Sequence, residues 1–189
     1  MDINIAVIKD RRIEPILEKK GYNIKQVKIY YSPFSSWLID LLILFILQLV
    51  IAIYLLPYKY IYFYATYFIF YVIVSYLFTA FLNNSFVTTK TELIVINPNF
   101  PFQKFITYKI SDIKEVSVGS SKWKYLNWLF LQFSGNYIQI VDNKKSDRFF
   151  CTSLALNAWD DSLAQKSIDS FLGNFQQMNV STNILVHKK

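Results

Sequence analysis

Two long uncharged apolar runs, separated by a short turn, constrain the fold of this chain more than any other feature. Eighteen residues without a charge lie between Asp40 and Lys59, and thirty lie between Lys59 and Lys90. A hydrocarbon core about 30 Å thick needs roughly 20 apolar residues in a helix. Segments 37–56 and 60–82 both reach that length. The sequence therefore predicts a transmembrane hairpin of two helices over residues 37–82.

The composition of the first run favours a membrane span over a buried helix. In Leu41–Leu56, thirteen of the sixteen residues are Leu, Ile, Val or Phe, and no polar stripe recurs at helical spacing. Pro57 then ends the run, because proline cannot donate a backbone hydrogen bond. With Tyr58, Lys59 and Tyr60 it forms a turn whose aromatic rings suit a membrane interface.

The distribution of basic residues predicts the orientation of the hairpin. Residues 1–39 carry seven Lys and Arg against four acids, and residues 83–189 carry twelve against eight, whereas the turn holds only Lys59. Basic residues that flank membrane spans mark the cytoplasmic side. We expect a multi-pass protein of the inner (cytoplasmic) membrane with both termini in the cytoplasm. The net charge of +7 then reflects this topology and attraction to anionic lipid rather than nucleic-acid binding.

Asp40 is the one ionisable residue inside the predicted spans. An intramembrane carboxylate often marks an ion or substrate path. Here it follows two candidate helix caps, Ser35 and Ser36, and a carboxylate in the first turn stabilises the positive end of the helix dipole. We therefore expect Asp40 to mark the start of the first helix at the inner interface.

Gln48 lies near the middle of the first span. Antiparallel pairing about the 57–60 turn places it level with about residue 69, near Thr66, Tyr67 and Tyr71. A hydrogen bond between the helices, worth ~0.6 kcal/mol, is preferred to a transport site. Gln48 is therefore expected to make an interhelical polar contact.

The chain after residue 82 reads as a separate strand-rich unit. We expect a cytoplasmic N-terminal segment at 1–36, the hairpin at 37–82, a β-rich domain at 83–178 and a tail at 179–189. Alternating apolar residues and turn signals predict strands at 85–89, 92–97, 105–110, 113–118, 126–133, 137–141 and 148–151. A helix is expected at 158–175, where apolar residues recur at helical spacing, and a short helix and a strand at 11–20 and 24–31.

The order of these elements resembles small bacterial membrane proteins with pleckstrin-homology-like (PH-like) domains. The stretch 91–96, followed by 106–116 with its hydrophobic step Ser111-Asp112-Ile113-Lys114-Glu115-Val116, is similar to that group's pattern. Residues 135–140 match a later strand, and 158–175 match the closing helix. The resemblance implies a bent antiparallel sheet capped by a C-terminal helix, an α+β or all-β domain. It carries over no ligand residues, since only Lys90 lies in the first hairpin.

The residue types required for catalysis are scarce. His187, the one histidine, lies in the tail beside two lysines, and the single Cys151 lies in an apolar stretch. The sequence contains no cluster of Cys and His with the spacing of a zinc site and no glycine-rich phosphate loop. We therefore expect no enzymatic activity, no catalytic residues, no metal and no cofactor.

A basic aromatic run is the candidate binding surface. Lys122, Trp123, Lys124 and Tyr125 follow a Gly-Ser-Ser lead, and their alternation of charge and ring area suits lipid headgroups or a partner protein. The other interpretation places the tryptophan in the core of an apolar strand. These four residues are the predicted site for membrane or partner binding.

The sequence thus predicts a non-enzymatic inner-membrane protein whose PH-like domain mediates interaction with a protein or a membrane surface, or oligomerisation. Its expected partners are the lipid bilayer and either another protein or further copies of itself, with no nucleic acid. An oligomeric pore or transporter subunit, built around Asp40 and Gln48, is the alternative. Immunity to a toxin or a role in envelope stress also remains open.

Overall fold

The computed structural model describes most of the chain. The described residues are 9–32, 34–55, 61–99, 101, 104–120, 136–150 and 161–185. The predicted strand at 126–133 and the basic aromatic run at 122–125 lie outside them.

The body of the molecule consists of two four-stranded sheets. The first has the order β1-β2-β3-β4 and is antiparallel throughout, and the second has the order β7-β6-β5-β8, in which β8 runs parallel to β5. The strands of the first sheet are β1 (Lys28–Tyr30), β2 (Ser85–Thr88), β3 (Glu92–Asn97) and β4 (Lys104–Lys109). The strands of the second sheet are β5 (Ile113–Ser120), β6 (Asn136–Asp142), β7 (Ser146–Phe150) and β8 (Ser181–Leu185).

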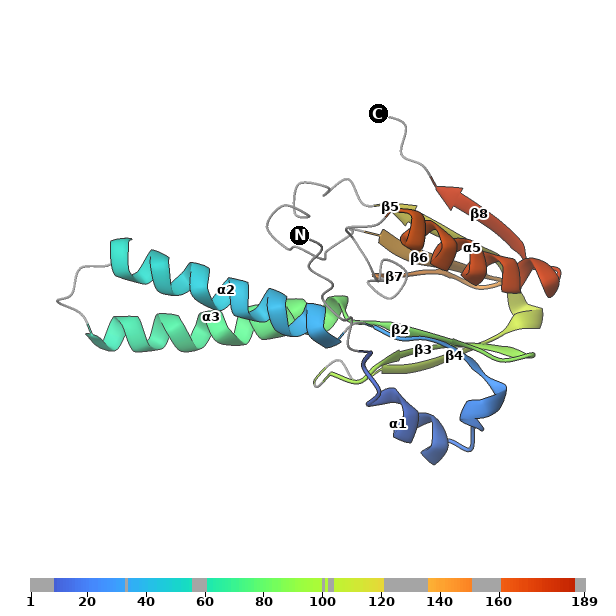
Figure 1. Ribbon diagram of the computed structural model, residues 1–189, viewed down its shortest axis with the longest axis horizontal. Coiled ribbons are helices and arrows are strands. Elements are labelled where there is room, and N and C mark those ends of the chain that lie inside the picture. Colours follow the sequence, from blue (N-terminus) through green and yellow to red (C-terminus); the bar gives the residue numbers. More distant parts are fainter. Residues whose placement is uncertain are drawn as a thin grey trace.

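Helices surround the two sheets and extend away from them (Figure 1). The α-helices are α1 (Ile13–Lys19), α2 (Phe34–Leu55), α3 (Ile61–Leu82) and α5 (Asp161–Gln177), with short 3-10 helices η1 (Ile24–Gln26) and η2 (Ile110–Asp112). Helix α1 lies on the outer side of the first sheet, and α5 lies beside the second sheet (Figure 1). Helices α2 and α3 form a hairpin that projects from one end of the body (Figure 1).

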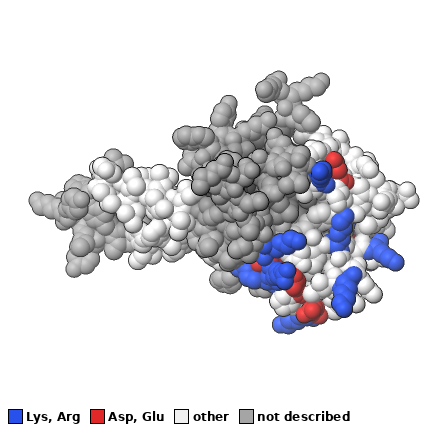
Figure 2. Space-filling model, in the orientation of Figure 1, with Lys and Arg blue, Asp and Glu red and all other residues white. Residues whose placement is uncertain are grey.

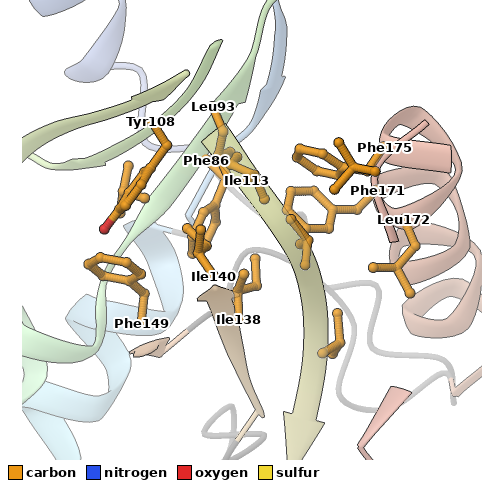
Figure 3. Close-up of a cluster of buried hydrophobic side chains, with 14 of the residues drawn as sticks. Phe86, Leu93, Tyr108, Ile113, Ile138, Ile140, Phe149, Phe171, Leu172 and Phe175 are labelled. Atoms are coloured by element: carbon orange, nitrogen blue, oxygen red, sulfur yellow. The ribbon is translucent and has the colours of Figure 1, made fainter. Parts of the chain in front are cut away.

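The main core lies between the two sheets and α5 (Figure 3). Phe171 and Phe175 of α5 are fully buried, and the ring of Phe171 packs edge-on against Tyr30 of β1 and Phe86 of β2. The first sheet also contributes Leu93, Val95 and Tyr108, and the second contributes Val116, Val118, Ile138, Ile140 and Phe149. One face of each sheet is therefore apolar, as strand alternation requires.

A second, smaller core lies on the opposite face of the first sheet. Ile13 and Leu17 of α1 pack against Val87, Ile94 and Ile96 of β2 and β3. All five side chains are completely buried. Strand β3 is apolar on both faces for this reason, since α1 covers the side that the main core leaves open.

Most of the predicted secondary structure is confirmed. Strand β3 spans the predicted residues, and the ends of β2, β4, β5, β6 and β7 lie within two residues of those predicted. The short helix near the N-terminus is found as α1, and Gly21 follows it with a φ of 86°, a left-handed conformation that ends helices. The strand expected at 24–31 is shorter, as β1, and pairs with β2.

The prediction of a transmembrane hairpin is wrong. Among the residues whose side chains the structure describes, no helix is both long enough and apolar enough to cross a membrane. The expected multi-pass location in the inner membrane, with cytoplasmic termini, is contradicted by the same finding.

The predicted fold class needs a second correction. The expectation was a transmembrane hairpin followed by one bent antiparallel sheet with a capping helix, but the observed α+β fold has two separate sheets. The first sheet recruits β1 from the N-terminal segment, and the tail supplies β8 to the second sheet as a parallel strand. Both additions are pairings between distant parts of the chain, which local sequence patterns do not specify. The PH-like resemblance stays a prediction.

Candidate functional site: an uncharged hairpin and the polar network at its base

The predicted site residues do not converge on one place in the described structure. Lys122, Trp123, Lys124 and Tyr125 lie outside the described residues. The backbone of Asp40 belongs to α2, but this helix begins at Phe34, so Asp40 lies beyond the first turn in which a capping role was expected. Gln48 is the predicted site residue whose side-chain contacts the structure describes.

Gln48 holds the two helices of the hairpin together. The hydroxyl of Tyr67 donates a hydrogen bond of 2.6 Å to Gln48 Oε1. Tyr67 is one of the three residues expected opposite Gln48 from the antiparallel pairing. The Gln48 side chain is only 5% exposed, so this bond satisfies a polar group that is buried between apolar helices.

The hairpin exposes an unusual amount of apolar surface. Of the exposed large hydrophobic side chains in the described part of the chain, all but Ile184 lie on α2 and α3. Tyr54 is 81% exposed, Phe70 65% and Ile69 60%. The two helices contain no charged residue at 41–55 or 61–82. In Figure 2 the described side chains of the hairpin are white, the colour of residues other than Lys, Arg, Asp and Glu. Soluble proteins rarely leave so large an apolar surface uncovered.

A groove runs along the hairpin between these exposed side chains. It has a volume of about 510 Å³, and the described residues that line it come from α2 and α3: Leu42, Phe45, Gln48, Phe68, Tyr71, Val72, Ile73, Ser75 and Tyr76. The ring of Phe45 packs edge-on against Phe68 across the helix pair, with centroids 5.2 Å apart. The groove is therefore apolar, open and close in size to a few large side chains.

A buried polar network joins the base of the hairpin to the body. Asp10 is 1% exposed, and Arg12 donates to it from Nε and Nη2 over 2.8 and 2.6 Å. The same Nη2 donates to Asn99 Oδ1 over 2.9 Å. The hydrogen bond with Asp10 raises the pKa of the Arg12 guanidinium, so the arginine stays charged. A fork of this kind fixes the N-terminal segment against the loop after β3.

Asparagines carry the network onward to α3 and β7. Asn97 donates to the Ala80 carbonyl of α3 over 3.0 Å and to Asn84 Oδ1 over 3.3 Å. Asn84 donates to the carbonyls of Phe81 and Phe150, over 3.2 and 3.0 Å. Ser85, the residue after Asn84, is hydrogen-bonded to Ser32, and both serines are completely buried. The last turn of α3 is therefore held by both sheets.

The comparisons with known proteins identify no relative. No protein-family model, no curated protein and no solved structure matches the chain.

Sequence reasoning missed the network and read the exposed face as lipid-facing. Asn97 and Asn99 were interpreted only as turn residues, and Asn84 at the end of the second apolar run was given no role. The signal in the sequence was their position: Asn83 and Asn84 follow the apolar run at 60–82, and Asn97 and Asn99 stand at the end of the apolar strand at 92–97. Among the described residues the structure shows no group of three or more His, Cys, Asp or Glu placed to hold a metal ion. The contacts described at this site are apolar packing and hydrogen bonds.

Proposed function

We propose that this protein is a non-enzymatic assembly protein that associates with a second copy of itself through the uncharged hairpin of α2 and α3. The observation that carries the proposal is the concentration of exposed large apolar side chains on these two helices. Burying a large side chain of this kind is worth about 1.5–3 kcal/mol. Several of them together drive association strongly, even after the entropy cost of bringing two molecules together.

The charge of the hairpin favours a second copy as the occupant. A charged partner would have to bury its charges against a surface that offers no charged residue between 41 and 55 or between 61 and 82. The matching occupant is therefore uncharged and apolar. The hairpin of another copy has that chemistry, and it carries both protruding side chains, such as Phe70, and a groove of its own.

The architecture of the hairpin supports the same choice. Two packed helices bury only their facing sides, whereas two such hairpins together form a four-helix bundle with an enclosed apolar core. A two-fold dimer uses the same surface on both subunits, so each contact between a protruding side chain and the groove of the other copy is made twice. Gln48 is already bonded to Tyr67, and Thr79 donates to the Ser75 carbonyl, so these polar groups are satisfied within one hairpin.

Sedimentation equilibrium of the full chain in detergent-free buffer tests the proposal. We expect a dimer or larger oligomer of the 22.3 kDa chain, whose dissociation constant rises at least tenfold in Phe70→Lys. The matched control is Ile184→Lys, because Ile184 is the one large hydrophobic residue that is exposed outside the hairpin in the described part of the chain, at 48%. It should associate like the parent. A strict monomer at all concentrations, or equal loss of association in both variants, would contradict the proposal.

A further inference from the structure

Strand β8 lies at the margin of the second sheet, beside α5 (Figure 1). It pairs with β5 along one edge, and no described strand pairs with the other edge. An open edge presents backbone N–H and C=O groups, and proteins usually protect it with charged residues or proline. Residues 170–186 contain neither a charged residue nor a proline. The edge of β8 therefore lacks the usual protection against pairing with another extended chain.

A groove lies between this strand and α5. Its volume is about 540 Å³, and the described residues that line it are Asp169, Leu172, Gly173, Gln176, Thr182, Asn183 and Ile184. The last three are consecutive in β8, and consecutive side chains of a strand point to opposite faces of the sheet. A cavity that reaches all three passes around the edge of the strand. Because β5 occupies one edge, the groove follows the open one.

The walls of the groove suit a single added strand. A Cβ at Gly173 of α5 would meet nothing within 4 Å, so the helix leaves space beside the strand. Leu172 is 5% exposed and belongs to the main core, so the buried part of the lining is apolar. Gln176 donates a hydrogen bond of 2.8 Å to Thr182 Oγ1, which ties the helix to the strand near their connecting turn. Ile184 is 48% exposed and offers an apolar side chain farther along the strand.

The charges at the groove favour an uncharged occupant. Asp169 is the one charged residue among the described residues of the lining. Lys166 precedes it by one turn of α5, and residues three apart on a helix are neighbours, so the opposite charges offset each other. A charged segment would therefore gain no net attraction, and its charges would lose water against the apolar part of the lining. An uncharged segment has no such cost.

We infer that the open edge of β8 binds a short, uncharged, extended segment of a partner protein, which joins the second sheet as an added strand beside α5. An extended backbone supplies donors and acceptors at the spacing of a strand edge, about 3.3 Å per residue. An apolar side chain of the segment, on the same face as Ile184, packs against it. This surface is separate from the hairpin that we propose joins two copies.

The size of the edge favours a short segment over a second copy of the chain. Strand β8 is five residues long. A stable dimer buries roughly 800 Å² on each partner, which is more than one short strand edge supplies. Recognition of peptides by strand addition needs only main-chain hydrogen bonds and a place for alternate side chains. The β8 edge and its groove provide both.

Titration of the full chain with the capped peptide acetyl-Thr-Val-Thr-Val-Thr-amide, followed by backbone amide NMR shifts, tests the inference. We expect saturable shifts in β8 and in residues 169–176 of α5, and slower hydrogen exchange of the β8 amides. Gly173→Leu should weaken binding roughly tenfold, because its side chain fills the space that the helix leaves open. The matched control is Gln177→Leu, which places the same side chain on an exposed residue of α5 outside the described lining. It should bind like the parent.

Two N-methylated forms of the peptide test edge pairing on the unaltered protein. Alternate amides of a strand point to opposite edges, so methylation of the threonine amides blocks one edge of the peptide and methylation of the valine amides blocks the other. We expect one form to bind like the unmodified peptide and the other to lose affinity by roughly tenfold, because a peptide added to β8 uses only one of its edges.

Four results would overturn the inference. Three are no saturation at millimolar peptide, equal weakening by Gly173→Leu and Gln177→Leu, and equal binding of the two methylated forms. The fourth is a shift of the β8 amides that grows with protein concentration in the absence of peptide, which would assign the edge to a second copy of the chain.

Discussion

The hairpin and the two-sheet body are both rich in apolar residues, but the body buries its large apolar side chains whereas the hairpin exposes many of them. In the body, large apolar side chains such as Phe86, Phe171 and Phe175 are fully buried between the sheets and α5. In the hairpin, residues of the same type, such as Phe70 and Ile69, face outward. The comparison teaches that apolar content alone does not locate a core. A stretch that is apolar on every side needs a second molecule or surface to cover what its own fold leaves exposed.

The largest difference in stability between the two regions should appear when one aromatic ring is removed from each. Phe171→Ala deletes a fully buried ring that packs against Tyr30, Phe86 and Phe175, and should cost about 3–5 kcal/mol of unfolding free energy. Phe70→Ala, at 65% exposure, should change the stability of the monomer by less than about 0.5 kcal/mol. Urea denaturation at low protein concentration measures both values. Equal losses would erase the distinction between the two regions.

The polar network at the base of the hairpin ranks second. Asn97→Ala removes one donor from the Ala80 carbonyl, the donor to Asn84 Oδ1 and the acceptor for Asn99, and should cost about 1–3 kcal/mol because these groups are buried. Hydrogen exchange should show the loss first in the last turn of α3, where the hairpin meets the body. Gln139→Ala, which removes an exposed pair with Arg148, is the control and should be nearly neutral. If hydrogen exchange instead shows the loss of protection only in the sheets, the polar network does not connect the hairpin to the body.

A pair of glycine substitutions sharpens the contrast within the body itself. A Cβ at Gly119 of β5 would clash with the ring of Tyr137, which is itself buried, so Gly119→Ala should cost about 1–3 kcal/mol. A Cβ at Gly173 of α5 would meet nothing within 4 Å, so Gly173→Ala should stabilise the protein by about 0.5–1 kcal/mol. Thermal unfolding of the two variants measures the opposite signs. A shift of both in one direction would contradict the packing described for β5 and β6.

The smallest predicted effect is electrostatic and belongs to the body. Burial would raise the pKa of Asp147, but hydrogen bonds from Lys145 and Tyr108 outweigh it and hold that pKa below its usual range. A carboxylate whose pKa is lower in the folded state stabilises the protein above its unfolded pKa of about 4. That contribution is lost as the pH falls through the folded pKa. Asp147→Asn should remove this part of the acid sensitivity, at a cost of about 1 kcal/mol or less at pH 7.

The free energy of unfolding, measured as the pH is lowered in the parent and in Asp147→Asn, tests this contribution. Asp169→Asn is the control, since Asp169 is exposed on α5 and accepts its described hydrogen bond from Gln165, one turn away on the same helix. Its acid profile should follow that of the parent. Identical profiles for all three proteins would show that the contacts of Asp147 with Lys145 and Tyr108 contribute nothing to stability.

Local patterns predicted much of the body because its strands alternate or are bounded by turn residues. Strands β2, β3, β4 and β6 carry apolar residues at clear spacing, and the turn at 142–145 is marked by Asp142, which accepts hydrogen bonds from the amides of Lys144 and Lys145. Strand β8 was missed because Ser181–Leu185 has no alternation, and its burial is partial. It is a strand because β5 offers it a parallel edge, which is a pairing across more than sixty residues.

The hairpin shows the limit of the same reasoning. The apolar runs correctly indicated two paired helices, and the antiparallel pairing placed Tyr67 opposite Gln48. The inference from apolar length to a membrane crossing was wrong, since no helix in the described part of the chain meets both requirements for one. Length and composition specify an apolar surface without saying what covers it. The asparagine network escaped because its members come from α3, β3 and two loops that meet only in the folded chain.

Site-specific thiol labelling tests most directly whether the hairpin is covered by a second copy. In a Cys151→Ser background, single cysteines replace Phe70 on the hairpin and Ile184 on β8, two positions that are both exposed in one chain. Our account predicts that labelling of the Phe70 position slows at least tenfold as the protein concentration rises in detergent-free buffer, while labelling of the Ile184 position stays constant. Equal labelling rates at both positions over the whole concentration range would contradict it.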